Sequence, residues 1–373
     1  MQKTILILIQ STDATITGFQ EKGLWERQYF TIENYLSEFD VYYYTSDSKT
    51  LQNMLPNGSV HKVAKYASGI YGLRHILFYI YLLQESFKWK KLNCVIRVFG
   101  VNLPILPFLK LISSKKIVSS FQYDWAEQTN KNYGLKDIKK HLASFIQYNS
   151  LKYSNSIIST MAWLEEKVQK SFPKKSTIII PNYVNTDIFT PKSKKKQIVF
   201  AGRLHWSKGV DTLIETFINF NKSYNEYKLI ILGDGVDRQK LENLASNNKN
   251  ILFKGNVSFS NVANYFNESE IFVLPTKTME GHPKALIEAM ASGCKCITSN
   301  VPGNKDVLEQ SDTKEYIFDP QNSDDLLKKI QFALQDDVIF KKQYHFALNK
   351  YDSKILFKKE IKFLKNNLKD ENV

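Results

Sequence analysis

Short apolar runs alternate with longer helical stretches along almost the entire chain. Runs such as Thr4–Ile9, Cys94–Phe99 and Gln197–Ala201 have the length and composition of buried strands, and a polar loop and a helical stretch follow each of them. Strands that alternate with helices pair in parallel sheets with helices on both faces. The pattern therefore predicts an α/β fold.

A polar segment rich in proline and lysine divides this pattern into two halves. Pro181 to Pro191 is followed by the charged run Lys192–Lys196, after which the alternation begins again. The 373 residues are enough for two domains, each with its own core. We expect an N-terminal domain over residues 1–191, a second domain over residues 192–345 and a C-terminal helix over residues 346–373.

The chain is basic and contains few cysteines. Its net charge is +14, and residues 1–190 alone carry 23 Lys or Arg against 14 acidic residues. An acidic partner is expected: nucleic acid, a phosphorylated small molecule or an anionic membrane surface. The three cysteines, Cys94, Cys294 and Cys296, are too few for a disulfide framework and lack zinc-site spacing, so we expect buried thiols and no bound metal.

The apolar runs are too short to cross a membrane. The longest, Ile76–Leu83, has eight residues, whereas a bilayer span needs roughly 20. Met1–Gln10 contains only five consecutive apolar residues, and it is read as a first strand rather than a signal peptide. We therefore expect a cytoplasmic protein.

The stretch Leu274–Asn300 contains the strongest site signal. An apolar run ends at Pro275, a polar loop follows, and Ala285–Ala291 consists of strong helix formers, which predicts a strand, a loop and a helix. The loop would lie at the carboxyl end of the strand, where parallel sheets bind ligands, and the first helical amides would face any phosphate there. Glu280 lies in the loop, and Glu288 lies one turn into the helix.

Arg203 and Lys208 form a second candidate site, in a loop that follows another strand. A guanidinium and an ammonium that converge on one place suit a diphosphate, although a solvated basic loop is the alternative. Glu288 could accept hydrogen bonds from a ribose diol, or it could face solvent at a helix N-terminus. Glu280 could hold sugar hydroxyls.

Two features of the first half and one of the second are weaker signals. Asp124 follows a strand and could enter a site or cap the strand, and Gly18 lies in the loop after the first strand. We take both as candidate site residues of the first half. Gly233-Asp234-Gly235 lacks the third glycine of a dinucleotide fingerprint.

Four motifs of the second half together resemble one known family. They are Phe200–Gly209 (FAGRLHWSKG), Leu232–Gly235 (LGDG), Phe253–Val257 (FKGNV) and Glu280–Gly293 (EGHPKALIEAMASG), and Ile178–Phe189 resembles the same family's interdomain segment. In this order and spacing they look like the donor-binding half of the retaining, nucleotide-sugar glycosyltransferases of GT-B fold, in their large fourth family (group 1). The resemblance covers roughly residues 178–310.

The resemblance implies a GT-B architecture, in which two Rossmann-like domains with parallel sheets face each other across a cleft. The N-terminal domain would bind the acceptor and the second domain the nucleotide-sugar donor, and the final helix would cross back to the first domain. It also implies transfer with retention, from a nucleotide-diphosphate sugar and without a metal or other cofactor, to a glycan or lipid-linked acceptor in surface-polysaccharide or glycoconjugate synthesis.

Residue roles follow from the same resemblance. Arg203 and Lys208 would bind the donor diphosphate and stabilise its departure, Glu280 would hold the donor sugar, and Glu288 the ribose. The other donor-binding positions implied are Gly202, Asn256, Val257, Gly281, His282, Pro283, Lys284 and Ala285. His282 stands where an aromatic residue or glycine is common. Family members often have a histidine where this chain has Gln122–Trp125, which puts a catalytic role of Asp124 in doubt.

Three alternatives stay open at this stage. A GT-B epimerase or phosphorylase would keep the fold without the transfer, and the basic charge suggests a nucleic-acid-binding protein as a remote alternative. Tyr71–Leu92 and Leu103–Lys116 mix apolar and basic residues, so they are either membrane-surface elements or ordinary sheet-covering helices with solvated lysines.

Overall fold

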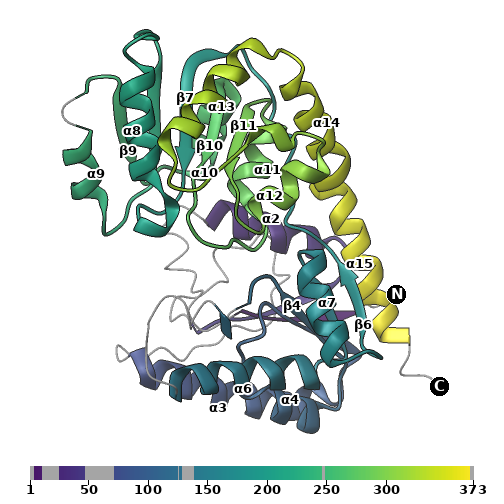
Figure 1. Cartoon of the computed structure of the whole chain (residues 1–373). Helices are drawn as coiled ribbons and strands as arrows, with labels where there is room; N and C mark the ends of the chain where they lie inside the picture. Colours follow the sequence, from purple (N-terminus) through teal and green to yellow (C-terminus); the bar gives the residue numbers. More distant parts are fainter. Residues whose placement is uncertain are drawn as a thin grey trace. The chain divides into compact units, whose positions relative to one another are not determined.

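The computed structural model describes residues 4–10, 25–46, 71–124, 126–127, 138–245 and 248–369. The chain forms two compact units: unit 1 comprises Met1–Ile180 and Phe357–Val373, and unit 2 comprises Pro181–Leu356. Each unit contains one six-stranded sheet in which the paired strands are parallel (Figure 1). The predicted α/β fold with two parallel sheets is confirmed.

The sheet of unit 1 has the strand order β2-β1-β3-β4-β5-β6. Strands β3 and β4 are buried along their whole length, as expected for strands with helices on both faces. The strands are β1 (Ile5–Ile9), β2 (Asp40–Tyr44), β3 (Cys94–Val98), β4 (Ile117–Phe121), β5 (Ser156–Ser159) and β6 (Ser176–Ile179).

The two faces of this sheet are covered by different helices. Along β3, Ile96 packs in one core cluster with Phe78 of α3 and Leu109 of α4. The next residue, Arg97, points to the opposite face because side chains alternate along a strand, and it pairs with Glu360 of α15. The helices of unit 1 are α2 (Trp25–Leu36), α3 (Tyr71–Trp89), α4 (Leu106–Ser113), α6 (Ile138–Tyr153), α7 (Ala162–Ser171) and most of α15 (Ser353–Lys369).

Unit 2 has the strand order β12-β11-β10-β7-β8-β9. From β7 the chain builds outward through β8 and β9 and then returns to the other side of β7 with β10, so the direction of winding reverses between β7 and β10. The strands are β7 (Lys195–Ala201), β8 (Lys228–Leu232), β9 (Ile251–Gly255), β10 (Ser269–Leu274), β11 (Lys295–Ser299) and β12 (Ile317–Phe318). Ligands of open α/β sheets bind outside the carboxyl ends of the strands at such a reversal.

The helices of unit 2 pack over this sheet in two groups. Helix α8 contacts α9 and α13, and α11 contacts α10 and α14. Their bounds are α8 (Val210–Phe220), α9 (Arg238–Leu244), α10 (Phe259–Glu268), α11 (Lys284–Ala291), α12 (Asn304–Gln310), α13 (Ser323–Gln335) and α14 (Ile339–Tyr351), with short 3-10 turns at Trp206–Lys208 (η3) and Lys314–Tyr316 (η4).

The segment from Pro181 to Pro191 belongs to unit 2, so the first part of unit 1 ends at Ile180 and not at residue 191. Val184 donates its N–H to the carbonyl of Tyr351 at 2.8 Å and accepts from the N–H of Ser353 at 3.0 Å. The buried ring of Phe189 packs on Phe259. These contacts hold the segment against the unit 2 core. Its polar sequence predicts a linker and gives no sign of this packing.

Helix α15 begins in unit 2, and from Phe357 onward it is part of unit 1. Glu360 Oε1 accepts hydrogen bonds from Arg97 Nε at 2.9 Å and from the Tyr35 hydroxyl at 2.7 Å, and Arg97 and Glu360 are both at least 96% buried. Within the described ranges, no helix is both long enough and apolar enough to span a bilayer.

Replacing Glu360 by alanine should strongly destabilise unit 1. The substitution leaves the Arg97 guanidinium buried without its carboxylate, which costs about 3–5 kcal/mol of unfolding free energy. The matched control is Glu38→Ala, which removes an exposed ion pair with Lys365 of the same helix and should cost about 0–1 kcal/mol. Urea unfolding followed by circular dichroism measures both, and equal losses would contradict the structural role of Glu360.

Candidate functional site

Two loops lie side by side at the reversal point of the unit 2 sheet. Residues 202–209 follow β7, and residues 275–283 follow β10, the neighbouring parallel strand. The N–H of Lys277 donates to the carbonyl of Ser207 at 2.7 Å, and Lys277 Nζ pairs with Asp211 at 2.7 Å. The second loop is thus held to the first by a main-chain hydrogen bond and to the start of the following helix, α8, by an ion pair.

Gly209 permits this close approach. Its φ angle is +65°, and a Cβ atom at this position would lie 2.0 Å from the carbonyl oxygen of Pro275. A side chain is therefore excluded on steric grounds as well as by backbone conformation. Glycine here places the preceding residue, Lys208, next to the second loop.

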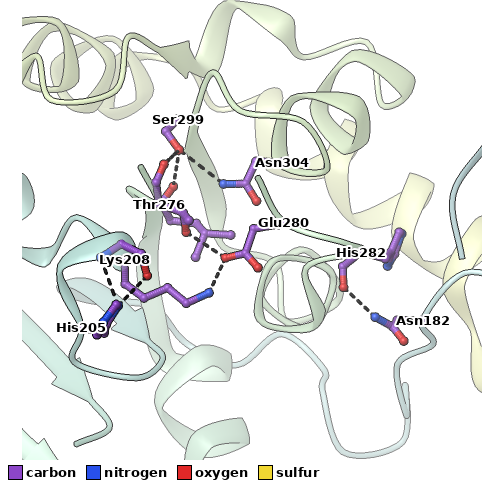
Figure 2. Close-up of polar contacts among 10 residues, drawn as sticks. Asn182, His205, Lys208, Thr276, Glu280, His282, Ser299 and Asn304 are labelled. Atoms are coloured by element: carbon purple, nitrogen blue, oxygen red, sulfur yellow. Dashed lines mark hydrogen bonds and ion pairs between the residues drawn. The ribbon is translucent and has the colours of Figure 1, made fainter. Parts of the chain in front are cut away.

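Lys208 and Glu280 form an ion pair across the two loops (Figure 2). Glu280 Oε1 also accepts a hydrogen bond from Thr276 Oγ1 at 3.1 Å. The two charged side chains remain 26% and 20% exposed, so the pair lies at the surface of unit 2 and not in its core. The structure thus brings together two of the predicted site residues that are far apart in the sequence.

Residues at the end of β11 and just after it support the second loop. Ser299 Oγ donates to the carbonyl of Thr276 at 2.5 Å, and Asn304 Nδ2 donates to Ser299 Oγ at 3.3 Å (Figure 2). The N–H of Glu280 donates to the carbonyl of Pro302 at 3.0 Å. The sequence pattern missed these supporting residues because their roles depend on the pairing of β10 with β11.

Arg203 lies in the first loop but does not join the ion pair. Its side chain is exposed, and it has no hydrogen-bonding or ionic partner within the part of unit 2 that the structure describes. The two residues that are predicted to bind the diphosphate therefore differ in their pairing. Lys208 is paired with a carboxylate, and Arg203 has all its donors open to a ligand.

His282 anchors the far end of the second loop. Its carbonyl accepts a hydrogen bond from Asn182 Nδ2 at 2.6 Å, and its buried ring packs edge-on against Tyr351 at 4.8 Å between centroids. In the described structure neither ring nitrogen has a hydrogen-bond partner. Burial, with the nearby charges of Lys284 and Lys350, lowers the pKa of His282 to about 3.

Helix α11 follows this loop directly. The helix begins after Pro283, and no side chain caps its N-terminus. Lys284 lies at the start of the helix with its Nζ 5.8 Å from the ring centroid of Tyr183. Glu288 is 2% exposed, so the alternative that it faces solvent is wrong.

The remaining residues that are predicted to bind the donor substrate also lie at the carboxyl ends of the unit 2 strands. Gly202 follows β7 directly, and its N–H donates to the carbonyl of Leu232 at 3.0 Å. Asn256 and Val257 follow β9, the edge strand; Asn256 is exposed, and Val257 packs partly on the core. Gly281 and Ala285, on either side of His282 and Pro283, are partly exposed.

Asp124, the candidate in unit 1, is engaged in local contacts. Its carboxylate pairs with Lys167 and accepts hydrogen bonds from Gln147 Nε2 at 3.1 Å and from the N–H of Glu127 at 3.0 Å. Burial alone would raise the pKa of Asp124, but these donors outweigh it and lower the pKa below its usual value. The contacts are those of the capping alternative. Gly18 lies outside the described residues.

The described residues contain no group of three or more His, Cys, Asp or Glu side chains arranged to hold a metal ion. Cys94, Cys294 and Cys296 are buried free thiols, as predicted. Burial raises the pKa of Cys294 to about 11, which keeps this sulfur protonated and unreactive.

The buried imidazole should make the stability of unit 2 depend on pH. Because the pKa of His282 in the folded chain lies below its ordinary value of 6.5, the unfolded chain binds more protons between pH 6.5 and about 3. The unfolding free energy should therefore fall as the pH decreases through this window, by up to about 1.4 kcal/mol per pH unit.

His282→Phe should remove this contribution and keep the aromatic contact with Tyr351. Urea unfolding of both proteins at several pH values between 7 and 5 measures the difference. Parallel pH profiles for the variant and the original chain would show that His282 is not the titrating group.

Comparison with known proteins finds a family model that matches the part of the chain containing this site. Residues 185–352 match the model of the group 1 glycosyl transferases. An uncharacterised glycosyltransferase of Haemophilus influenzae is 28% identical over 193 residues, which are 49% of this chain and 53% of the relative. The lipopolysaccharide 1,2-N-acetylglucosaminetransferase of Salmonella typhimurium is 21% identical over 202 residues, 48% of this chain and 53% of that protein.

A solved structure resembles the whole chain. HepE from Anabaena, in complex with UDP and glucose, has a TM-score of 0.73 and covers 96% of this chain and 99% of its own, at 12% identity. The sequence matches, by contrast, span only about half the length of the two relatives. The chain has the GT-B fold, and residues 185–352, somewhat less than half of its length, match the family model of the group 1 glycosyl transferases.

Proposed function

We propose that this protein transfers a sugar from a nucleotide-diphosphate donor to a hydroxyl of a glycan or lipid-linked acceptor, in glycoconjugate synthesis. One observation carries the proposal: the loops after β7 and β10 bring Arg203, Lys208 and Glu280 to the reversal point of a sheet that matches the group 1 glycosyltransferases. Relatives named for lipopolysaccharide synthesis and for UDP and glucose binding support the same donor and acceptor classes.

In this proposal the diphosphate binds between the two basic residues. The guanidinium of Arg203 supplies a planar fork of donors, and Lys208 supplies a point charge. Because Lys208 is already paired with Glu280, it bridges the carboxylate and the phosphate when the donor arrives. Stabilising the leaving diphosphate by fixed positive charge is the main electrostatic task of such a site.

We assign the binding of the sugar, ribose and base of the donor to residues at the same carboxyl ends of the unit 2 strands. Glu280 holds hydroxyls of the sugar, the main-chain amides from Gly281 to Ala285 bind hydroxyls and phosphate, and Glu288 binds the ribose. Asn256 and Val257 lie beside the base. The uncapped N-terminus of α11 supports the amide assignment, since such an end attracts phosphate.

We further propose transfer with retention and without a metal ion. Retention requires the acceptor hydroxyl to attack from the face that the diphosphate leaves, and close positioning then contributes more than a strong base. Nuclear magnetic resonance of the product reads its anomeric configuration, and an inverted anomer would refute retention. Turnover that EDTA abolishes would refute metal independence.

On the acceptor side we assign unit 1, at the inner face of a membrane in the cytoplasm. Asp124 is not assigned to chemistry, because its carboxylate already caps local structure. No finding supports the epimerase, phosphorylase or nucleic-acid-binding alternatives. A panel of nucleotide sugars tests the proposal directly: a transferase releases nucleoside diphosphate, whereas an epimerase returns an altered nucleotide sugar.

Arg203→Ala and Lys208→Ala should each lower turnover by about 10²–10³-fold, as loss of one transition-state donor does. Release of nucleoside diphosphate in the presence of acceptor measures this effect. Lys228→Ala is the matched control, because Lys228 is an exposed lysine at the amino end of β8, whereas the site lies at the carboxyl ends of the strands. Near-normal turnover in both site variants would refute the proposed diphosphate site.

Glu288→Gln should weaken nucleotide binding about tenfold, because the charge-assisted hydrogen bonds to the ribose become neutral ones. Calorimetric titration with UDP and with GDP measures the affinity. Glu215→Gln on the exposed side of α8 controls for the charge change. Unchanged affinity for whichever nucleotide binds would remove Glu288 from the ribose site.

A further inference from the structure

Helix α3 is apolar on both of its faces. The inner face packs Phe78 and Leu82 into the unit 1 core. On the outer face, four large apolar side chains are 43–64% exposed: Leu73, Ile76, Ile80 and Phe87. They follow helical spacing over a length of about 21 Å. Packing against the sheet explains the first face of the helix but not the second.

Two neighbouring helices extend this surface. Helix α4 contacts both α3 and α6, so the three form one layer (Figure 1). Phe108 and Leu111 of α4 are 58% and 78% exposed, and Leu142 and Phe145 of α6 are 55% and 66% exposed. We call these four residues and the four of α3 the apolar face. Single exposed apolar residues are normal, but eight on three adjacent helices mark an interaction surface.

The three helices that bear the apolar face contain almost no acidic residues. The sequences of α3, α4 and α6 contain a single acidic residue, Glu85, which is buried. Exposed lysines lie at the carboxyl ends of two of these helices: Lys90 and Lys91 follow α3, and Lys152 is in the last turn of α6. Because helices that connect parallel strands run in one common direction, these ends share one rim of the layer.

We propose that the apolar face docks on an anionic lipid bilayer, with α3, α4 and α6 parallel to its surface. Side chains such as Phe87 and Leu111 enter the boundary between head groups and acyl chains, and the lysine rim contacts anionic head groups. A surface of apolar side chains with a basic border and no exposed acid is the pattern of interfacial helices. A protein partner of matching shape would not require this one-sided charge.

The inference deepens the proposed acceptor class, because docking would bring the enzyme to a lipid-linked acceptor. It rests on unit 1 alone and uses no residue of the donor site. Failure to dock would therefore leave release of nucleoside diphosphate intact, and failure of transfer would leave docking intact.

Flotation of the full chain with vesicles tests the proposal. Binding is expected with an equal mixture of phosphatidylcholine and phosphatidylglycerol, and little with phosphatidylcholine alone. High salt should weaken this binding, since the Debye screening length falls to about 3 Å at 1 M salt. Absence of binding to the anionic vesicles at low salt, or equal binding to both kinds, would overturn the proposal.

Two sets of substitutions identify the surface. Ile76→Ser, Ile80→Ser, Phe108→Ser and Leu111→Ser combined should lower binding at least tenfold, and Lys90→Gln with Lys91→Gln should lower it several-fold. The matched control combines Val236→Ser, Phe332→Ser and Val338→Ser, which remove exposed apolar side chains of unit 2 and should leave binding unchanged.

Circular dichroism verifies that the variants fold. Unchanged binding of the apolar-face variant would overturn the assignment. A dimer in light scattering that becomes a monomer in the same variant would assign the surface to a second copy of the chain and would also overturn it.

Discussion

The main-chain contact between Gly209 and Pro275 sets the geometry of the whole candidate site. It joins two loops from adjacent parallel strands at a distance that only glycine allows. The first loop is equally confined on its other side, where a Cβ atom on Gly233 would lie 2.0 Å from the carbonyl oxygen of Gly202 and one on Gly235 would lie 2.2 Å from that of Leu204. The position of Lys208 is therefore fixed by packed backbone.

This confinement has an electrostatic consequence. Lys208 and Glu280 are held in contact by their loops, so their pairing costs less side-chain entropy than a pair of free surface residues would. Arg203, at the start of the same loop, remains unpaired among the described residues. The candidate site thus presents one ammonium that is partly neutralised by its carboxylate and one guanidinium that is open to a ligand, as the proposed diphosphate site requires.

The sequence predicts the strand, loop and helix of this site better than it predicts the residues that hold them in place. Strand, loop and helix at residues 269–291 follow from local apolar spacing, and Arg203, Lys208 and Glu280 can be proposed from loop chemistry and family motifs. Local patterns contain no information on the partner of a side chain, however. The hydrogen bond from Asn182 to the carbonyl of His282 spans 100 residues, and it exists because the segment after Pro181 folds onto unit 2.

Buried charge and exposed apolar surface were the hardest features to predict, for the same physical reason. Residue type gives a mean preference for burial, whereas these positions depend on which face of an element a neighbour covers. Arg97 is buried because β3 alternates and Glu360, 263 residues later, reaches it from α15. Helix α3 shows the converse: Phe78 and Ile80 are equally apolar, yet the sheet covers only Phe78. The alternation that specifies the fold cannot, by itself, distinguish a sheet-covering face from a face built for a second partner.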